Sequence, residues 1–196
     1  MAFEIIQLPS DPEGAKPYVE HYKAFRLLSL QTSPETFAST YEREIAFTDD
    51  IWLGRLINPD ATTFIATQNN QIMGTLTILG PLPFAADEMS ASSNPWESTG
   101  ASPQPVAHWR FNGMFTLPEA RRQGIAKALI QKAQMFASSR AAALGKEFIG
   151  SIVTESENTA ATALYRKCGF VHIKEESMTV RGGTVSVILM KCIPDI

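Results

Sequence analysis

A short turn with three cationic side chains around one glycine is the segment of this sequence best suited to chemistry. Arg121, Arg122 and Lys127 lie close in sequence to Gly124. Apolar residues at helical spacing predict a helix over residues 123–143. The first amides of a helix lack partners inside it and carry partial positive charge, so the turn is suited to cradle a phosphate or pyrophosphate. A helix start with arginines is also common in proteins that bind no anion, and the segment alone leaves both interpretations open.

The elements that must position this turn alternate between strands and helices along the chain. Predicted strands cover residues 3–8, 62–68, 71–79, 108–116, 147–154, 170–177 and 184–191. Predicted helices cover residues 16–31, 48–57, 123–143 and 159–167, and Ser33-Pro34 predicts a helix restart with Ser33 as its N-cap. This order predicts one mixed α/β domain over residues 1–196, with a right-handed parallel crossover between residues 108 and 154.

Asparagine and glycine residues, which tolerate positive φ, mark the turns between these elements. Asn69-Asn70 predicts a tight hairpin between two strands. Thr48, Asp49 and Asp50 are candidate N-caps for the helix that follows them. Gly145 is expected to end the helix over residues 123–143, and Gly169 is expected to end the helix over residues 159–167.

The stretch over residues 81–107 shows no helical or strand period. It contains five of the twelve prolines and is about 25 residues long, well beyond the usual connection. Two interpretations stay open, a mobile surface excursion or a flap over a site.

Composition excludes several classes of function. The 196-residue chain has a formal net charge of −3, so no basic surplus predicts a nucleic-acid partner. No run of roughly 18 apolar residues occurs, so we expect no membrane span. Cys168 and Cys192 are too few for a disulfide framework and lack zinc-site spacing, so we expect a reducing compartment and no metal. Because the N-terminus is unlike a signal peptide, we expect a cytoplasmic protein.

A second motif stands after the next predicted strand. It reads Asn158-x-x-Ala161-x-x-Leu164-Tyr165-x-Lys167-x-Gly169-Phe170. Together with Arg121-x-x-Gly124-x-Ala126, it resembles the GCN5-related N-acetyltransferase (GNAT) superfamily, whose acetyl-CoA pyrophosphate signature has the same spacing. The segment Ser33-Pro34-Glu35-Thr36-Phe37 is also similar to the region between the first helices of many members.

The resemblance covers nearly the whole chain and implies a fold. That fold has a central mixed, mostly antiparallel twisted sheet, flanked by about four helices, with a parallel strand pair splayed at the acetyl-CoA site. The stretch over residues 81–107 would be an enlargement of it. Asn112-Gly113 between apolar runs is typical of a hairpin, which would break the strand over residues 108–116. The family's alternative is a β-bulge in which the glycine relieves a kink, and we expect the bulge.

The resemblance also assigns roles to residues of both motifs. The strand end that pairs with the pantetheine arm of acetyl-CoA, like an added strand, comprises Met114, Phe115 and Thr116. The loop expected to hold the pyrophosphate comprises Arg121, Arg122, Gln123, Gly124, Ile125, Ala126 and Lys127. Asn158 corresponds to the asparagine that contacts the pantetheine, and Tyr165 to the tyrosine near the sulfur.

Tyr165 is the catalytic residue that the resemblance implies. A phenol has a reference pKa of about 10 and a thiol about 8.5, so Tyr165 is protonated at neutral pH and can protonate the departing thiolate. Packing on the sheet is the alternative role for a helical tyrosine. A backbone amide near Met114–Thr116 could stabilise the negative charge that develops on the carbonyl oxygen.

The sequence identifies no general base. Many family members place a glutamate on a central strand, but residues 108–116 contain no carboxylate. Glu155 and Glu157 are typical of solvated acids near a helix start, and His108 of a structural histidine at a strand start. A base that acts through ordered water stays open.

The leading hypothesis is an acetyl-CoA-dependent N-acetyltransferase, an acyltransferase that transfers groups other than amino-acyl groups. The expected acceptor is a primary amine on a small molecule, and the expected state is a monomer or homodimer. A protein N-acetyltransferase and a non-catalytic acyl-CoA-binding sensor or interaction module are the alternatives. The missing strand glutamate supports the sensor, whereas Tyr165 supports the enzyme. A phosphate site in an unrelated α/β protein is a weaker hypothesis.

Overall fold

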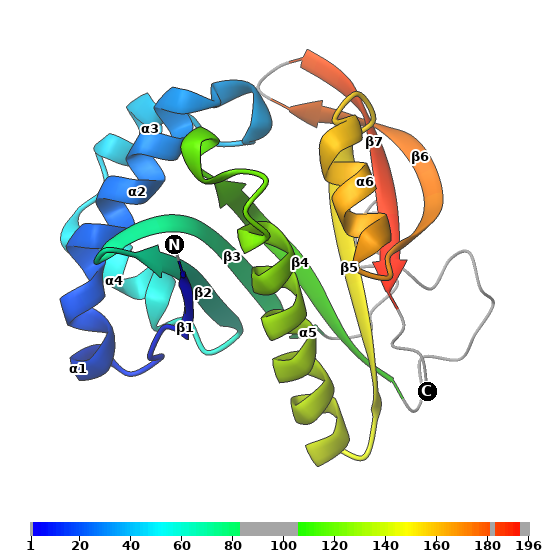
Figure 1. Ribbon diagram of the computed structural model, residues 1–196, viewed down its shortest axis with the longest axis horizontal. Helices are drawn as coiled ribbons and strands as arrows, with labels where there is room; N and C mark the ends of the chain where they lie inside the picture. The colour runs from blue at the N-terminus through cyan, green and yellow to red at the C-terminus, as the bar shows by residue number, and fades with distance from the viewer. Residues whose placement is uncertain (1, 83–105, 181–182, 193–196) are drawn as a thin grey trace. The chain divides into compact units, whose positions relative to one another are not determined.

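The computed structural model describes residues 2–82, 106–180 and 183–192 (Figure 1). Its strands are β1 (Glu4–Gln7), β2 (Ala61–Gln68), β3 (Gln71–Leu82), β4 (Val106–Thr116), β5 (Glu147–Glu155), β6 (Val171–Val180) and β7 (Gly183–Cys192). Its helices are α1 (Pro12–Ala15), α2 (Val19–Thr32), α3 (Tyr41–Ile45), α4 (Asp49–Leu56), α5 (Ile125–Ala143) and α6 (Thr159–Lys167), and its 3-10 helices are η1 (Lys16–Tyr18), η2 (Pro34–Thr36) and η4 (Pro118–Ala120). None of these described helices is long and apolar enough to cross a membrane.

The strands of the described residues form a seven-stranded sheet in the order β1-β2-β3-β4-β5-β7-β6. β4 and β5 run parallel, with Val106 opposite Glu147 and Phe111 opposite Ile152. β1 with β2, β5 with β7 and β6 with β7 are antiparallel pairs. The predicted mixed sheet with a parallel pair is therefore confirmed, and α5 is the helix of the crossover between the parallel strands.

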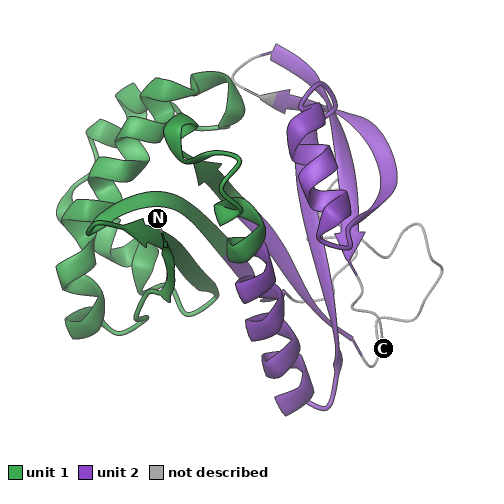
Figure 2. Ribbon diagram, viewed as in Figure 1, with its two compact units in different colours: residues 1–77, 113–129 green, residues 78–112, 130–196 purple. Residues whose placement is uncertain are grey.

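The chain divides into two compact units (Figure 2). Unit 1 contains residues 1–77 and 113–129, and unit 2 contains residues 78–112 and 130–196. β3, β4 and α5 each contribute residues to both units. The expectation of one domain over residues 1–196 stays a prediction.

The core of unit 1 joins its first helices to β2 and to the end of β1. Leu8, Val19, Trp52, Leu56 and Ile65 are buried together there. Trp52 and Leu56 are four residues apart on α4 and therefore lie on one face of that helix. This packing holds α1, α2 and α4 against the strands that precede the turn.

Aromatic rings form the core of unit 2. Phe111 packs edge-to-face on Phe170, with ring centroids 5.4 Å apart at an interplanar angle of 82°. Trp109 lies 6.0 Å from Phe148, and Tyr165 of α6 lies 6.1 Å from Phe170, between ring centroids. Because Trp109 and Phe111 are two residues apart, they share the face of β4 that α6 covers.

Several predicted turns and helix ends are confirmed. Asn69 and Asn70 adopt φ values of 50° and 62° in the hairpin between β2 and β3. Of the three N-cap candidates for α4, the Thr48 side chain makes the capping hydrogen bond. Gly145 with φ 67° follows α5, and Gly169 with φ 84° follows α6. At each of these positions the local backbone conformation restricts which residue types fit, so the residue type itself indicates the turn or the helix end.

The segment between α2 and α4, and the start of the chain, differ from their predictions. η2 is a single turn with Pro34 at its start, but the Ser33 side chain makes no capping hydrogen bond. Instead, Thr36 Oγ1 donates to the Ser33 carbonyl at 2.9 Å. Two short helices, α1 and α3, were not predicted from the sequence. Asp11 caps α1 by accepting from the Gly14 amide at 2.9 Å. Such short helices carry too few residues to show an apolar period.

β4 runs without a break through Asn112-Gly113, so the hairpin alternative is wrong. Gly113 adopts φ 61°, the left-handed value that the bulge hypothesis assigns to a glycine. Thr75 Oγ1 of β3 donates to the Gly113 carbonyl at 3.3 Å. The register with β5 ends at the pair Phe111–Ile152, just before this glycine.

The predicted stretch over residues 81–107 lies largely outside the described residues. β3 extends to Leu82 and β4 begins at Val106, so strand structure covers both of its ends. Residues 83–105 are not described, and the choice between a surface excursion and a flap stays a prediction.

Candidate functional site

The predicted phosphate cradle lies in unit 1, between the end of β4 and the start of α5. The Leu117 amide donates to the Met73 carbonyl of β3 at 3.0 Å, which fixes the chain just before the turn. η4 follows, and the Ala120 amide donates back to the Leu117 carbonyl at 2.9 Å. Pro118 begins η4 because its fixed φ suits the first position of a helical turn. The chain therefore enters the cradle in a defined direction.

Two residues of the turn adopt positive φ. Arg122 has φ 65° and Gly124 has φ 84°. A non-glycine residue in this region is uncommon, and such strain is concentrated at functional sites. A Cβ at Gly124 would meet no heavy atom within 4 Å, so packing does not require the glycine. Its missing side chain instead leaves the backbone open to the approach of a ligand.

The start of α5 supplies the hydrogen-bond donors of the cradle. The Gly124 carbonyl accepts from the Ala128 amide at 3.0 Å, so the helical hydrogen bonds begin at this glycine. The amides of Ile125, Ala126 and Lys127 precede Ala128 and have no acceptor inside the helix. The Ile125 side chain is buried, which orients the first turn.

The side chains around the turn add positive charge. Arg121, Arg122 and Lys127 are exposed, and none of them forms an ion pair with another described residue. Arg121 Nε donates to the Thr116 carbonyl at 3.2 Å, and its guanidinium lies 5.7 Å from the centroid of the Phe115 ring. The turn thus combines amides that have no acceptor inside the helix with cations that form no ion pair among the described residues, a donor set that suits a pyrophosphate.

The predicted strand end, Met114 to Thr116, is held by aromatic packing. Met114 is half-buried, whereas Phe115 is buried with its ring centroid 6.1 Å from Phe25 and 5.5 Å from Phe37. Thr116 Oγ1 is buried and forms no hydrogen bond with any described residue. A buried polar atom without a partner is costly, so this hydroxyl is suited to meet a bound molecule.

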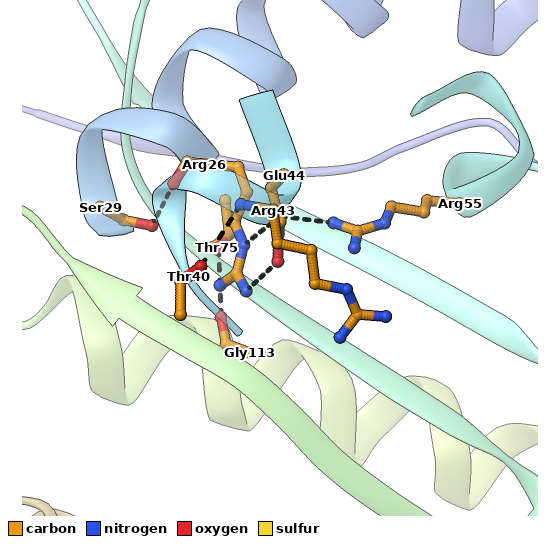
Figure 3. Close-up of polar contacts among 8 residues, drawn as sticks. All are labelled: Arg26, Ser29, Thr40, Arg43, Glu44, Arg55, Thr75 and Gly113. Carbon is orange, nitrogen blue, oxygen red and sulfur yellow. Dashed lines mark hydrogen bonds and ion pairs between the residues drawn. The ribbon is translucent and has the colours of Figure 1, made fainter. Parts of the chain in front are cut away.

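A buried carboxylate that was not predicted from the sequence is linked to this strand end through Phe37. Glu44 of α3 forms ion pairs with Arg26 of α2 and Arg55 of α4, each at 2.8 Å (Figure 3). The Arg26 guanidinium also lies 4.4 Å from the centroid of the Phe37 ring. Burial alone would raise the pKa of Glu44, but the hydrogen bonds from both arginines lower it to about 2. The carboxylate is therefore ionised and ties three helices together.

The two predicted residues of α6 lie in unit 2. Asn158 caps α6, because its side-chain oxygen accepts from the Ala161 amide at 3.1 Å. This leaves its amide nitrogen for the predicted contact with pantetheine. Tyr165 is buried against Phe170, and burial, followed by Cys168, raises the pKa of its phenol above the ordinary value. Tyr165 is therefore protonated at neutral pH.

The predicted site residues fall into two groups. The residues from Met114 to Lys127 belong to unit 1, where they form the strand end, the turn and the first turn of α5. Asn158 and Tyr165 belong to unit 2, where they stand before the first turn and in the last turns of α6. The N-cap role of Asn158 was missed, although an asparagine directly before a predicted helix indicates it.

The acid–base candidates of the sequence have different environments. His108 is buried with its Nε2 at 2.6 Å from Ser151 Oγ, and burial, followed by Arg110, lowers the pKa of its imidazole to about 3. Glu155 is half-buried and Glu157 is exposed. Among the residues that the structure describes, no group of three or more His, Cys, Asp or Glu side chains could hold a metal ion.

Comparison with protein families gives one match. The model of the acetyltransferase (GNAT) family matches residues 23–170, a range that contains the cradle and both predicted residues of α6. No curated protein sequence matches the chain.

Solved structures share the fold over nearly the whole chain. The acetyltransferase of the GNAT family from Streptococcus pneumoniae is 18% identical with a TM-score of 0.66, and the match covers 98% of this chain and 100% of that one. Spermidine N-acetyltransferase from Vibrio cholerae in complex with CoA and spermine is 13% identical with a TM-score of 0.63, covering 97% and 95%. Arabidopsis thaliana NAA60 in complex with a bisubstrate analogue is 13% identical with a TM-score of 0.62, covering 98% and 100%.

Proposed function

Because the chain belongs to the acetyltransferase (GNAT) family, we propose that it transfers the acetyl group of acetyl-CoA to a primary amine. The observation that carries the proposal is the exposed turn in which Gly124, at φ 84°, precedes the amides of α5 that have no acceptor inside the helix. Such a turn is a ready-made site for a pyrophosphate, and CoA carries one.

The donor set of unit 1 fits CoA. The amides of Ile125, Ala126 and Lys127 would hold the pyrophosphate. Arg121 and Arg122 are exposed, so their positive charges would be accessible to its oxygens. The strand end from Met114 to Thr116 would pair with the pantetheine arm through its backbone. In unit 2, the Asn158 amide nitrogen would contribute a further donor to the arm.

When bound, acetyl-CoA supplies a thioester whose carbonyl carbon the amine nitrogen attacks, and the carbon–sulfur bond then breaks. Tyr165 would donate its phenolic proton to the departing sulfur, and the proton that the attacking nitrogen loses would pass to solvent. The raised pKa of Tyr165 keeps that proton on the phenol at neutral pH. A backbone amide of the strand end would stabilise the carbonyl oxygen as negative charge develops there. We assign no described residue as general base.

The acceptor that we propose is a primary amine on a small molecule. We further propose that the protein is cytoplasmic and acts as a monomer or homodimer. Spermidine N-acetyltransferase from Vibrio cholerae, whose fold this chain shares, was solved with the polyamine spermine. The ribosomal-protein-S18-alanine N-acetyltransferase from Escherichia coli, with a TM-score of 0.60 and 14% identity over 100% of this chain and 96% of that one, acts on a protein. A protein amine is therefore the second candidate acceptor.

Incubation of the protein with acetyl-CoA and a panel of amines tests the proposal, with release of free thiol as the measurement. We expect free thiol to be released only when an amine is present. One equivalent of N-acetylated amine should form for each equivalent of thiol released. Tight acetyl-CoA binding without turnover of any small amine or peptide would contradict the enzyme and support the non-catalytic sensor.

A further inference from the structure

Unit 2 carries a row of polar side chains across three adjacent strands. Arg110 of β4 lies opposite Ser151 of β5, and Ser151 lies opposite Lys191 of β7. Residues opposite each other in a sheet share a face, and neighbouring strands are about 4.8 Å apart, so the three side chains stand next to one another. His108 joins this row through its Nε2, which lies 2.6 Å from Ser151 Oγ.

The row faces away from the aromatic core of unit 2. Trp109 and Phe111 are the neighbours of Arg110 in β4, so they point to the other face of the sheet. There Trp109 packs on Phe148 and Phe111 packs on Phe170, with ring centroids 6.0 and 5.4 Å apart. The row therefore plays no part in the packing of α6.

The row carries two cations, of which Arg110 is half-buried. Ser151 is fully buried and Lys191 is 8% exposed. The Arg110 Nε atom is buried and donates to no acceptor among the described residues, and neither Arg110 nor Lys191 forms an ion pair with any of them. Burial lowers the pKa of both groups, which reflects the cost of holding their charges out of water. His108 is neutral, since burial and Arg110 depress its pKa.

No carboxylate of the described residues neutralises these cations. Glu147 and Glu155 are the acids of β5 on this face, and each is separated from Ser151 by about 13 Å at the usual rise of a strand. Glu176 of β6 is paired with Lys174 at 3.4 Å. Buried charges are normally paired. An arginine and a lysine beside a buried hydroxyl therefore indicate an anionic partner that is not among the described residues.

We propose that the row formed by Arg110, Ser151 and Lys191 binds a small oxyanion, a carboxylate or a phosphate group. A guanidinium donates to two oxygens of such a group at once, and an ammonium donates as a point charge from the other side. The source that we assign is the acceptor itself, an amine that also carries an acidic group, as an α-amino acid does. This assignment of the source rests on the proposed function, whereas the anion site does not.

The anion site is tested by thermal unfolding with succinate or inorganic phosphate, in the presence of CoA so that the cradle of unit 1 is filled. We expect either anion to raise the melting temperature of the wild type and to have no effect on Lys191→Met. Without an anion, Lys191→Met should melt a few degrees higher than the wild type, because it removes an unpaired buried charge and keeps the shape of the side chain. Lys132→Met, at an exposed position of α5, is the matched control and should behave as the wild type. Equal stabilisation of the wild type and Lys191→Met would overturn the proposal.

The source of the anion is tested with pairs of amines that differ in one carboxylate, such as histidine and histamine. We expect kcat/KM to be at least about tenfold higher for the carboxylated member, and Lys191→Met to lose this preference. Turnover of both members at the same rate would overturn the assignment to the acceptor. Lys191-dependent anion binding without turnover of any amine would support the site and contradict the proposed function, so the two failures are distinguishable.

Discussion

Glu44 is fully buried, and Arg26 binds both of its carboxylate oxygens, Nη2 to Oε1 at 2.8 Å and Nε to Oε2 at 3.0 Å. Arg55 completes the group from a third helix at 2.8 Å. Both guanidiniums lie over aromatic rings, Arg26 over Phe37 and Arg55 over Phe47. The network therefore fixes α2, α3 and α4 to one another and, through Phe37, reaches the strand end of the candidate site.

We predict that Glu44→Gln destabilises the protein by about 3–5 kcal/mol, because it leaves two partly buried guanidiniums without a counter-charge. Urea-induced unfolding measures the loss. Asp49→Asn is the matched control, since Asp49 pairs with Lys23 at 2.8 Å but its side chain is 72% exposed. The control should lose far less stability, because exposed ion pairs contribute little. Equal losses in the two variants would show that the buried network does not carry the stability assigned to it.

The buried histidine predicts a specific sensitivity to acid. The pKa of His108 is about 3 in the folded protein, against an ordinary value of 6.5. Between these values the unfolded chain binds a proton that the folded protein does not, so stability falls as pH decreases through this window. From pH 6.5 to pH 5 the loss from this one group is about 2 kcal/mol, and carboxylates contribute little in that range.

Urea unfolding of the wild type and of His108→Gln at pH 6.5, 6 and 5 checks this prediction. The variant lacks the titrating imidazole, and its amide can still bond to Ser151. Its stability should therefore change less with pH than that of the wild type. Parallel profiles for the two proteins would mean that His108 is protonated in the folded state at the same pH as in the unfolded chain.

Local signals in the sequence predict much of the fold and the cradle. Asn69-Asn70 and Gly145 were identified correctly because a positive φ restricts the residue type at that position. The order of strands and helices followed from periodicity, and the turn around Gly124 from the spacing of a family motif. These features depend on short stretches of chain, so a single sequence displays them.

Features that depend on distant partners were not visible in the sequence. Glu44 lies 18 residues from Arg26 and 11 from Arg55, and no spacing rule connects positions on three separate helices. The row of Arg110 and Lys191 exists only because the registers of β4, β5 and β7 place them on either side of one serine. Register is set by packing of the whole sheet, which a pattern of residues does not specify.

The role of the cradle glycine is tested by one substitution at two sites. Gly124 and Gly145 have φ values of 84° and 67°, and a Cβ at either position meets no heavy atom within 4 Å. Replacement by glutamate therefore imposes a similar backbone strain of about 1–2 kcal/mol at both. We expect Gly124→Glu to lose acetyl-CoA binding, because it adds a side chain and a negative charge where the pyrophosphate binds. Gly145→Glu should bind as the wild type.

Isothermal titration calorimetry with acetyl-CoA measures both affinities, and circular dichroism confirms that both variants are folded. Unchanged affinity in Gly124→Glu would mean that the cradle is not the pyrophosphate site. An equal loss in the two variants would mean that strain, rather than position, causes the effect.

The acid role of Tyr165 is tested by removing its hydroxyl alone. Tyr165→Phe keeps the ring that packs on Phe170, so the fold of unit 2 should be maintained. A general acid contributes roughly 10²-fold or more to a rate, and we expect kcat to fall by that order while acetyl-CoA affinity stays nearly constant. Tyr22→Phe is the matched control, because burial also raises the pKa of that phenol but Tyr22 belongs to unit 1 and to no motif. Steady-state assays of thiol release give kcat, and isothermal titration calorimetry gives the affinity for acetyl-CoA. Equal turnover by the wild type and Tyr165→Phe would remove Tyr165 as the acid and leave it the packing role alone.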